Sequence, residues 1–204
     1  MKRTTIQVGS FEVCCSILSE NDKAWIVDPG QDSPRIIRTL KKLNLTPTAI
    51  LLTHAHFDHI GAIPALLTEF PNLPVFVHPQ DKTILGHPLN CLPPDYPLVE
   101  SSFAIQDATK ITQLDGLFDV ETIVTPGHTP GSVCYYFSKE KLLLSGDTLF
   151  AGSVGRTDLP GGDMATLMDS LSKIMRLPDE TVVIPGHGPQ TTIGREKRSN
   201  PFLR

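Results

Sequence analysis

The chain has 204 residues, of which 40% are hydrophobic and 20% are charged, a composition sufficient for a sizeable globular core. Its formal net charge is −4 and like charges do not cluster, which argues against a broad nucleic-acid-binding surface. No stretch approaches about 18 consecutive apolar residues, and the N-terminus lacks the apolar run of a signal peptide. We therefore expect a globular protein that binds neither nucleic acid nor membrane.

The four cysteines indicate a reducing compartment. Cys14 and Cys15 are adjacent, so in a strand they would point to opposite faces, and Cys91 and Cys134 stand alone. None of them forms a C-x-x-C pair. We interpret all four as buried reduced thiols rather than disulfides or metal ligands, and we predict a cytoplasmic location.

The first half of the chain alternates strand and helix patterns. The last of three opening strands stops at Asp28-Pro29-Gly30, and Ser33 is the candidate N-cap of the first helix. In chain order, we predict strands over 4–9, 11–18 and 23–30, a helix over 33–44, a strand over 49–53, a helix over 63–70 and a strand over 75–78.

The second half begins with a proline-rich segment, residues 86–101, that we expect to be irregular and on the surface. An amphipathic helix with Asp163 as a possible cap lies further on. In chain order, we predict strand–loop units over 122–128, 132–137 and 141–147, a helix over 164–177, a strand over 181–187 and a short helix over 191–199. Strands that alternate with helices in this way predict sheets covered by helices.

Several strands end in a polar residue followed by a glycine-rich turn. Residues 124–130 read VTPGHTP and residues 183–189 read VIPGHGP, so two apolar strands end in the same Pro-Gly-His sequence. IVDPG and LLLSGD are likewise apolar stretches that end at an aspartate next to glycine or proline. Strand ends of this kind can gather on one rim, where loops carry chemistry over a rigid scaffold.

Three of the 7 histidines lie within residues 53–61, which read THAHFDHIG directly after a buried strand. His54 and His56 would point the same way in an extended segment, and Asp58 and His59 follow where the chain turns into a helix. Divalent metals of borderline softness take imidazole and carboxylate together. The two pairs could hold two ions side by side. Further ligands are available at His128, Asp147 and His187, and the Asp147 carboxylate is suited to bridge two cations.

Other polar residues carry less specific predictions. His78 and His87 we interpret as capped or solvent-exposed side chains. Asp28 either orients a ligand histidine from behind or is a plain turn residue. Arg156, in a glycine-rich stretch, either pairs with a substrate carboxylate or forms a surface salt bridge.

The segments THAHFDHIG, PGHTPGS, LLLSGDTLF and PGHGP, in this order across nearly the whole chain, resemble the metallo-β-lactamase fold hydrolases. The resemblance implies an α/β fold, an αββα four-layer sandwich of two β-sheets flanked by helices, with metal ions at one edge of the sheets. It implies two divalent ions, zinc first and iron or manganese as alternatives. The implied ligands are His54, His56 and His128 for one ion, Asp58, His59 and His187 for the other, and Asp147 as the bridge.

Within that family, FAGSVGRTDLPGGD and TTIGREKRSNPFL resemble short bacterial relatives of glyoxalase II (hydroxyacylglutathione hydrolase). We expect one domain over residues 1–204, without the C-terminal helical domain that glyoxalase II carries. Where that family places a basic residue and an aromatic against the thiol cofactor, this chain has Arg156 followed by Thr157-Asp158-Leu159. The GRTD stretch also resembles persulfide dioxygenases, which use one iron.

The sequence thus predicts a metal-dependent hydrolase that cleaves a thioester, S-lactoylglutathione or a related acyl-glutathione, with a hydroxide held between two metal ions. A thiolate leaves without a strong general acid, Asp58 would bind metal and orient the hydroxide as the catalytic residue, and Arg156 would bind substrate. A mononuclear iron sulfur oxygenase is the alternative; a nuclease or a non-enzymatic metal-binding module is less well supported. We expect a small-molecule substrate and a monomer or small homo-oligomer, and leave the metal and the acyl group open.

Overall fold

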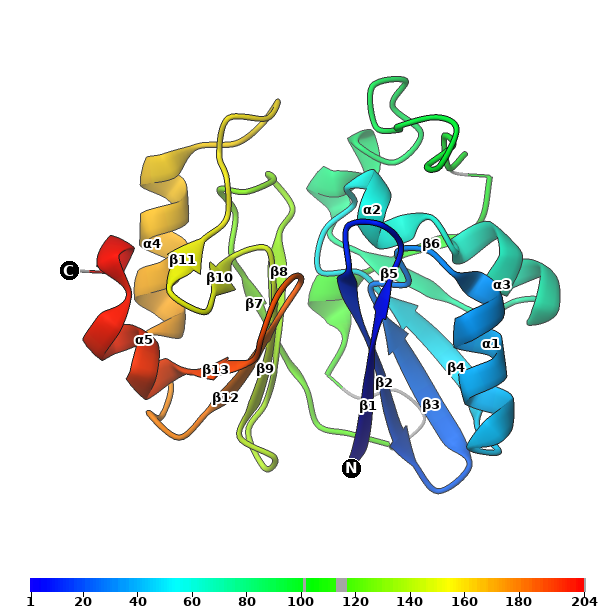
Figure 1. The fold of residues 1–204 in the computed structure, drawn as a ribbon, viewed down its shortest axis with the longest axis horizontal. Helices are drawn as coiled ribbons and strands as arrows, with labels where there is room; N and C mark the ends of the chain where they lie inside the picture. The colour runs from blue at the N-terminus through cyan, green and yellow to red at the C-terminus, as the bar shows by residue number, and fades with distance from the viewer. Residues whose placement is uncertain (101, 113–116, 204) are drawn as a thin grey trace.

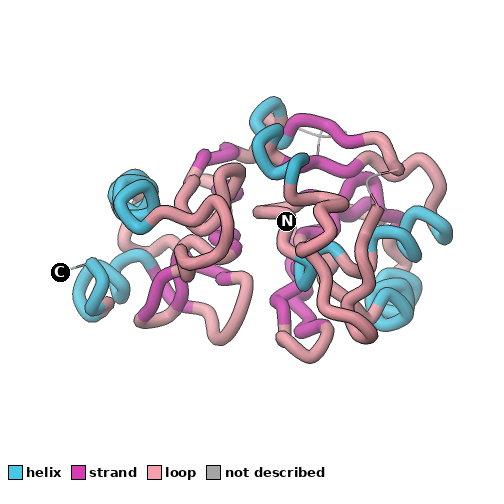
Figure 2. Tube along the Cα trace, turned by 90° about the horizontal axis from the view of Figure 1, so that it is seen from above, coloured by secondary structure: helices cyan, strands magenta, loops and turns pink. Residues whose placement is uncertain are grey.

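The structure is a computed structural model and describes residues 1–100, 102–112 and 117–203. Two sheets face each other and helices cover both outer faces, which gives four layers (Figure 1). Helices α1 (Ser33–Lys42) and α3 (Ile63–Glu69) lie on the first sheet, and α4 (Met164–Ile174) and α5 (Ile193–Ser199) lie on the second. The predicted αββα sandwich is confirmed. Seen from above, helices flank the strands and loops that lie between them (Figure 2).

The first sheet has six strands in chain order, antiparallel from the first to the third and parallel from the third onwards. The parallel strands end at the same edge of the sheet, and β4 leads directly into the THAHFDH segment. The strands are β1 (Lys2–Val8), β2 (Val13–Glu20), β3 (Lys23–Val27), β4 (Thr46–Leu51), β5 (Val75–Val77) and β6 (Ile105–Asp107).

The second sheet has five strands in the order β13-β12-β9-β8-β7. Because β8 is antiparallel to both β7 and β9, and β12 is parallel to β9, the strands β7, β9 and β12 run in one direction. Their carboxyl ends precede His128, Asp147 and His187. The strands are β7 (Glu121–Val124), β8 (Val133–Phe137), β9 (Leu142–Gly146), β12 (Val182–Pro185) and β13 (Thr191–Thr192), beside a hairpin of β10 (Leu149–Phe150) and β11 (Ser153–Val154).

The apolar core is divided into three layers, as four stacked layers require. Successive strand residues point to opposite faces, so neighbours in one strand enter different layers. In β2, Ile17 packs under the helices of the first sheet, whereas Leu18 packs between the sheets. In β9, Leu143 packs towards α4 while Leu144 faces the first sheet. Each sheet is therefore buried on both sides, which keeps its loop-bearing edge rigid.

Some predicted details were wrong. Asp32, not Ser33, occupies the N-cap position of α1, and its side chain accepts a hydrogen bond from Gly9 N instead of capping the helix. All four cysteines are free, but Cys14 and Cys91 are half-buried rather than buried. Cys14 and Cys15 do pack into different layers, as predicted. The Asp163 cap of α4 is confirmed, since its carboxylate accepts from Thr166 N at 2.7 Å.

The short elements carry no strong periodicity and were not predicted. They include the 3₁₀ turns η1 (Pro79–Thr83), η2 (Ala108–Lys110) and η3 (Pro201–Leu203), and the strands β6, β10 and β11. The strand β13 takes the first two residues of the predicted helix over 191–199, whereas α2 (Phe57–Ile60) lies where the chain was expected to turn into a helix. The expected irregular segment has neither helix nor strand over 86–100 apart from one isolated bridge, and its last residue, Ser101, lies outside the described residues. Across the described ranges, none of the helices reaches the length and apolar character needed to cross a membrane.

Candidate metal centre

The THAHFDH segment is shaped by a buried carboxylate behind it. Thr53 donates to Asp28 through both its backbone N (2.8 Å) and its hydroxyl (2.7 Å), which anchors the end of β4. His54 and His56 follow in the non-helical stretch, and His56 is the extended N-cap residue of α2. Asp58 and His59 lie in the single turn of α2. One short segment therefore presents four candidate ligands at different heights along the edge of the sandwich.

Glycines allow the second half of the molecule to approach these ligands closely. A Cβ at Gly186 would lie 2.0 Å from Asp147 Oδ1 and 2.9 Å from His59 Cε1. Gly127 has a φ of 132°, and a Cβ there would lie 2.4 Å from the backbone of Leu167 on α4. The two Pro-Gly-His turns are thus glycine-dependent, because any larger residue would displace the histidine that follows it.

All seven predicted ligands come together at this edge. The ligand atoms of each of three groups lie within 4.8 Å of one another: His54, His56 and His128; His54, His59 and Asp147; and Asp58, His59 and His187. The first and third groups match the two predicted sets. We call them the three-histidine group and the Asp58 group.

Asp147 lies between these two groups. Its Oδ2 is 3.6 Å from His128 Nε2 and 3.5 Å from His187 Nε2, and its Oδ1 is 3.5 Å from His59 Nε2. It therefore reaches nitrogens of both groups at once, which is the arrangement expected of a bridging carboxylate. Asp58 is the other carboxylate among the candidate ligands. In the part of the chain that the structure describes, its ion-pair contacts are with His59 and His187 of its own group.

The hydrogen bonds around the histidines direct lone pairs into the cluster. The Thr53 hydroxyl gives its proton to Asp28, so His54 Nδ1 is the donor in its 3.1 Å contact with that hydroxyl. His128 Nδ1 donates to the Arg156 carbonyl and His187 Nδ1 to the Phe11 carbonyl, each at 2.8 Å. In the neutral form of each ring, Nε2 is then the unprotonated acceptor, and it faces the other ligands.

These inward-facing atoms fit divalent metal ions. His54 Nε2 and Asp147 Oδ1 are buried and have no hydrogen-bond partner among the described residues, which is unfavourable without a cation. His56 Nδ1 and His128 Nε2 lie 3.0 Å apart, and because His128 Nδ1 donates to Arg156, only His56 can supply a proton to this contact in the neutral rings. A set of imidazoles and carboxylates suits zinc, iron or manganese.

The electrostatics of the two groups differ. Burial, followed by the neighbouring histidines, holds the pKa of His54 well below its usual range and lowers the pKa of His56 to about 3. Burial also opposes charge on His59, but Asp147, Asp58 and Asp28 outweigh it and raise the pKa of His59 to about 10. His54 and His56 are thus neutral, whereas the carboxylates around His59 favour a positive charge there, whether a proton or a metal ion.

Of the two interpretations of Asp28 that the sequence left open, the structure favours the one in which it orients a ligand histidine. Its Oδ2 lies 3.2 Å from His59 Nδ1, and the carboxylate also accepts both bonds from Thr53. The side chain is only 4% exposed. A carboxylate behind a histidine fixes the ring orientation and increases its basicity as a ligand.

Sequence reasoning missed other supports of the cluster. Asn90, from the proline-rich segment, accepts from Phe57 N and donates to the Ala55 carbonyl, so it brackets His56 on both sides. Asp81, in η1, bonds to the backbone beside two of the ligand-bearing turns. Neither residue belongs to a motif, and no spacing in the sequence pointed to them.

Arg156 forms a surface salt bridge, which was the second of its two predicted roles. Its guanidinium donates to both oxygens of Asp158 at 2.7 Å, and both side chains are more than half exposed. Its backbone carbonyl, rather than its side chain, touches the cluster, through His128. The predictions for His78 and His87 hold, since each accepts from the backbone N two residues further on.

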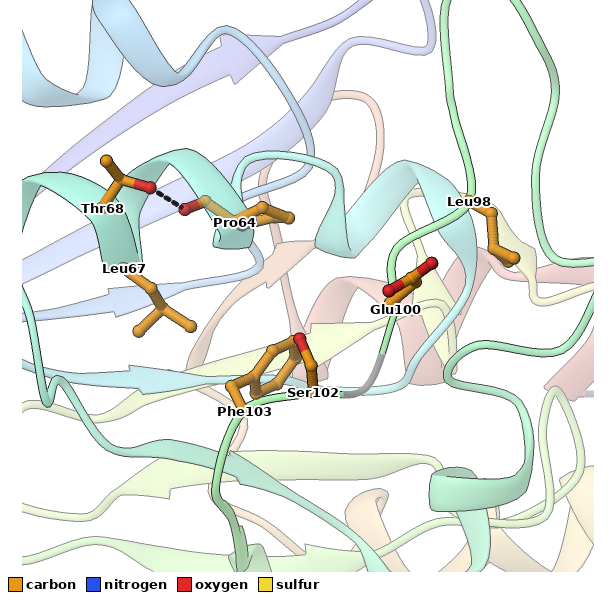
Figure 3. Close-up of a pocket in the computed structure, with 7 residues that line it drawn as sticks. All are labelled: Pro64, Leu67, Thr68, Leu98, Glu100, Ser102 and Phe103. Atoms are coloured by element: carbon orange, nitrogen blue, oxygen red, sulfur yellow. Dashed lines mark hydrogen bonds between the residues drawn. The ribbon is translucent and has the colours of Figure 1, made fainter.

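A surface hollow of about 470 Å³ lies beside α3 and contains none of the candidate ligands (Figure 3). Its walls include Leu67 and Phe103 with Glu100, and Thr68 there bonds to the Pro64 carbonyl of its own helix. The chemistry of the molecule is therefore concentrated at the metal cluster rather than in this hollow.

The sandwich and its donor cluster define a metal-dependent hydrolase fold, and residues 10–187 match the family described as the Metallo-beta-lactamase superfamily. The chain is 39% identical to the probable metallo-hydrolase YqgX of Bacillus subtilis, over all of this chain and 98% of that protein. It is 38% identical to the hydroxyacylglutathione hydrolase GloC of Haemophilus influenzae, over 97% of this chain and 96% of that protein. The chain belongs to the metallo-β-lactamase superfamily.

Solved structures agree with this fold. The B3 metallo-beta-lactamase BLEG-1 superposes with a TM-score of 0.92 at 42% identity, covering 99% of both chains. TTHA1623, solved in a di-iron-bound form, gives 0.89 at 37% identity, covering 98% of this chain and all of that one. ETHE1 from Myxococcus xanthus gives 0.78 at 28% identity, covering 98% of this chain and 84% of that one. Proteins with this fold therefore differ in their activities, and the fold alone does not assign a substrate.

Proposed function

We propose that this protein is a dinuclear metal-dependent hydrolase that cleaves thioesters, with acyl-glutathione compounds such as S-lactoylglutathione as the first substrate class. The observation that carries the proposal is the arrangement of seven donors in two groups with Asp147 reaching both. The relative named as a hydroxyacylglutathione hydrolase supports the substrate class.

The three-histidine group would hold one ion, the Asp58 group the other, and Asp147 would contact both. Zinc is the proposed metal, with iron or manganese as alternatives, and the di-iron-bound TTHA1623 supports iron among them. Ions held there would lower the pKa of a bound water to about 7 and polarise a carbonyl oxygen.

The chain itself would orient the nucleophile through Asp58. Burial alone raises the pKa of Asp58, but His59 and His187 outweigh it and lower the pKa to about 2. The group is therefore a carboxylate at neutral pH and can accept a hydrogen bond from an attacking water. Its Oδ2 is 3.4 Å from His187 Nε2, so the side chain faces into the cluster where that water would stand.

The leaving group explains why a thioester suits this site. A thiolate departs without protonation by a strong general acid. Of the carboxylates near the cluster, Asp28 is committed to Thr53 and His59, which leaves it unable to serve as a proton donor to substrate. The buried Asp81 carboxylate is likewise engaged with three donors.

Arg156 remains our proposed contact for a substrate carboxylate, but the substrate must first displace Asp158. Exposed ion pairs contribute little to stability, so such an exchange is inexpensive. A small-molecule thioester, a cytoplasmic location and a monomer or small homo-oligomer stay predictions.

The test is hydrolysis of S-lactoylglutathione with metal content measured on the same sample. We expect release of glutathione and two ions per chain. Asp147→Asn is the matched control, because it alters the shared ligand by one atom. A protein that holds two ions but hydrolyses neither this thioester nor a simple acyl thioester would overturn the proposal.

A sulfur oxygenase is the second candidate. It is favoured by the similarity to ETHE1, a persulfide dioxygenase, at 28% identity. It needs one iron and molecular oxygen, so oxygen consumption with glutathione persulfide, together with a single iron per chain, would decide for it.

A further inference from the structure

Asp81 is a buried carboxylate outside the ligand set. It lies in η1, directly after β5, and its residue exposure is 0%. Burial raises the pKa of this carboxyl, although three hydrogen bonds oppose that shift. A carboxylate without a charged partner is unfavourable in such a position unless its oxygens are well satisfied. Its contacts therefore indicate why it is there.

Those contacts join the two halves of the metal centre. Asp81 Oδ2 accepts from Ala55 N at 2.9 Å, and Ala55 stands between His54 and His56. The same oxygen accepts from the Thr129 hydroxyl at 2.9 Å, and Oδ1 accepts from Gly131 N at 2.7 Å. One side chain thus ties the THAHFDH segment of the first sheet to the Pro-Gly-His turn that carries His128 in the second.

Gly131 and Thr129 are both suited to this close contact with the Asp81 carboxylate. A Cβ on Gly131 would lie 2.5 Å from Asp81 Oδ1, so only glycine leaves room for the carboxylate. The Thr129 hydroxyl is shared with Ser132, whose hydroxyl lies 2.8 Å away and also accepts from Thr129 N. All three atoms that Asp81 contacts are donors, so the position requires a group that only accepts. An asparagine there would turn its amide N–H groups towards another N–H or hydroxyl.

We propose that Asp81 is a positioning residue that sets the spacing between the His54–His56 segment and His128, and thereby the metal affinity of the three-histidine group. The Asp58 group does not depend on it in the same way, because His59 Nδ1 faces the Asp28 carboxylate at 3.2 Å and His187 Nδ1 donates to the Phe11 carbonyl. The inference rests on the proposed metal centre but not on the proposed substrate.

Glu196 supplies a matched control. It is equally buried, and its carboxylate also takes three donors: Thr191 Oγ1 at 2.5 Å, Gly152 N at 2.8 Å and Asn200 Nδ2 at 2.8 Å. None of these partners is a candidate ligand or lies next to one. A purely structural contribution of a buried carboxylate should therefore appear in both variants, whereas an effect on one metal group should appear only at Asp81.

The experiment compares Asp81→Asn with Glu196→Gln in the full chain. Each ion's affinity is measured by competition with a chromophoric chelator, and the visible spectrum of the Co²⁺-substituted protein reports the ligand geometry. We expect Asp81→Asn to lose about 10- to 100-fold in affinity for one of the two ions and to change the cobalt spectrum. Glu196→Gln should keep both affinities and the wild-type spectrum, even where its melting temperature falls as far.

Equal metal affinities in the two variants, whether both retained or both reduced, would overturn the inference. If Asp81→Asn does not fold, Thr129→Val removes a single donor to the same carboxylate and should still weaken the same ion by several-fold; full affinity in that variant would also overturn it. A wild-type protein that holds two ions but cleaves no thioester would defeat the proposed function and leave this inference standing.

Discussion

The two metal groups are built from the same kinds of segment but differ in what stands behind their imidazoles. In the three-histidine group, His54 and His128 donate to neutral oxygens, the Thr53 hydroxyl and the Arg156 carbonyl. In the Asp58 group, His59 faces the Asp28 carboxylate. The first group is also more enclosed: the His128 side chain is 3% exposed, whereas that of His187 is 27% exposed.

This difference separates geometry from charge as the source of metal affinity. The three-histidine group has no carboxylate of its own apart from the shared Asp147, so its affinity depends on the spacing of three imidazole rings. The Asp58 group contains one carboxylate and has another, Asp28, directly behind His59, so attraction to a cation is stronger there. Its partly exposed histidine also indicates the side from which solvent and substrate reach the cluster.

The largest effect is expected at Asp147, the residue that contacts both groups. Asp147→Asn removes the anionic contact from both ions at once. We expect fewer than one ion per chain after dialysis and at least about a 1000-fold loss of thioesterase turnover, since metal assistance supplies several kcal/mol. Metal analysis and single-substrate kinetics on one sample provide the check; two tightly held ions in this variant would show that Asp147 does not bridge.

A change confined to the Asp58 group should act on chemistry as well as on binding. Asp58→Asn keeps the shape of the side chain but weakens its contact to metal and its acceptance of a hydrogen bond from water. We expect turnover to fall about 100-fold, the size seen when one key electrostatic group is lost. The three-histidine group should keep its ion. Near-normal turnover at full metal loading would mean that another residue orients the nucleophile.

Asp28→Asn tests the carboxylate that distinguishes the two groups. The variant weakens the contact behind His59 directly, and it reaches the three-histidine group only through the Thr53 hydroxyl that His54 contacts. We expect about a 10- to 100-fold loss of affinity for one ion and a smaller loss for the other, measured by chelator competition. The ion that is weakened most should be the one that Asp81→Asn spares, so the two variants should show opposite patterns in the cobalt spectrum. If Asp28→Asn and Asp81→Asn weaken the same ion most, the two groups do not differ in the way proposed.

The parts that sequence could predict are those in which chemistry depends on local spacing. The H-x-H-x-D-H segment and the repeated Pro-Gly-His turns placed six of the seven candidate ligands, and the end of LLLSGD placed Asp147, because each follows on a buried strand. Asp81 and Asn90 could not be found in this way, because their partners lie 26–50 and 33–35 residues away and meet them only in the folded sandwich. Two-residue strands such as β10 and β11 are too short to show any alternation.

The smallest predicted effect concerns substrate recognition beyond both groups. Arg156 had an acidic neighbour two residues away in the sequence, and the structure places the two in a bidentate pair. If Arg156 binds a carboxylate of the substrate, Asp158 competes with that carboxylate for the same guanidinium. Arg156→Ala should then raise KM for a glutathione thioester by about 2- to 5-fold, the range of exposed ion pairs, whereas Asp158→Asn should lower it.

Turnover should stay nearly constant in both variants, since the contact lies away from the reacting carbonyl and acts as uniform binding. A small uncharged thioester is the control, because it has no carboxylate for Arg156 to bind and its KM should not change. The opposite directions for the two variants are the decisive feature: a merely structural ion pair would be lost equally in both, and KM would then shift the same way in each. In that case Arg156 would shape the loop that supplies its carbonyl to His128, and recognition of the thiol half would have to come from elsewhere on the open, His187 side of the cluster.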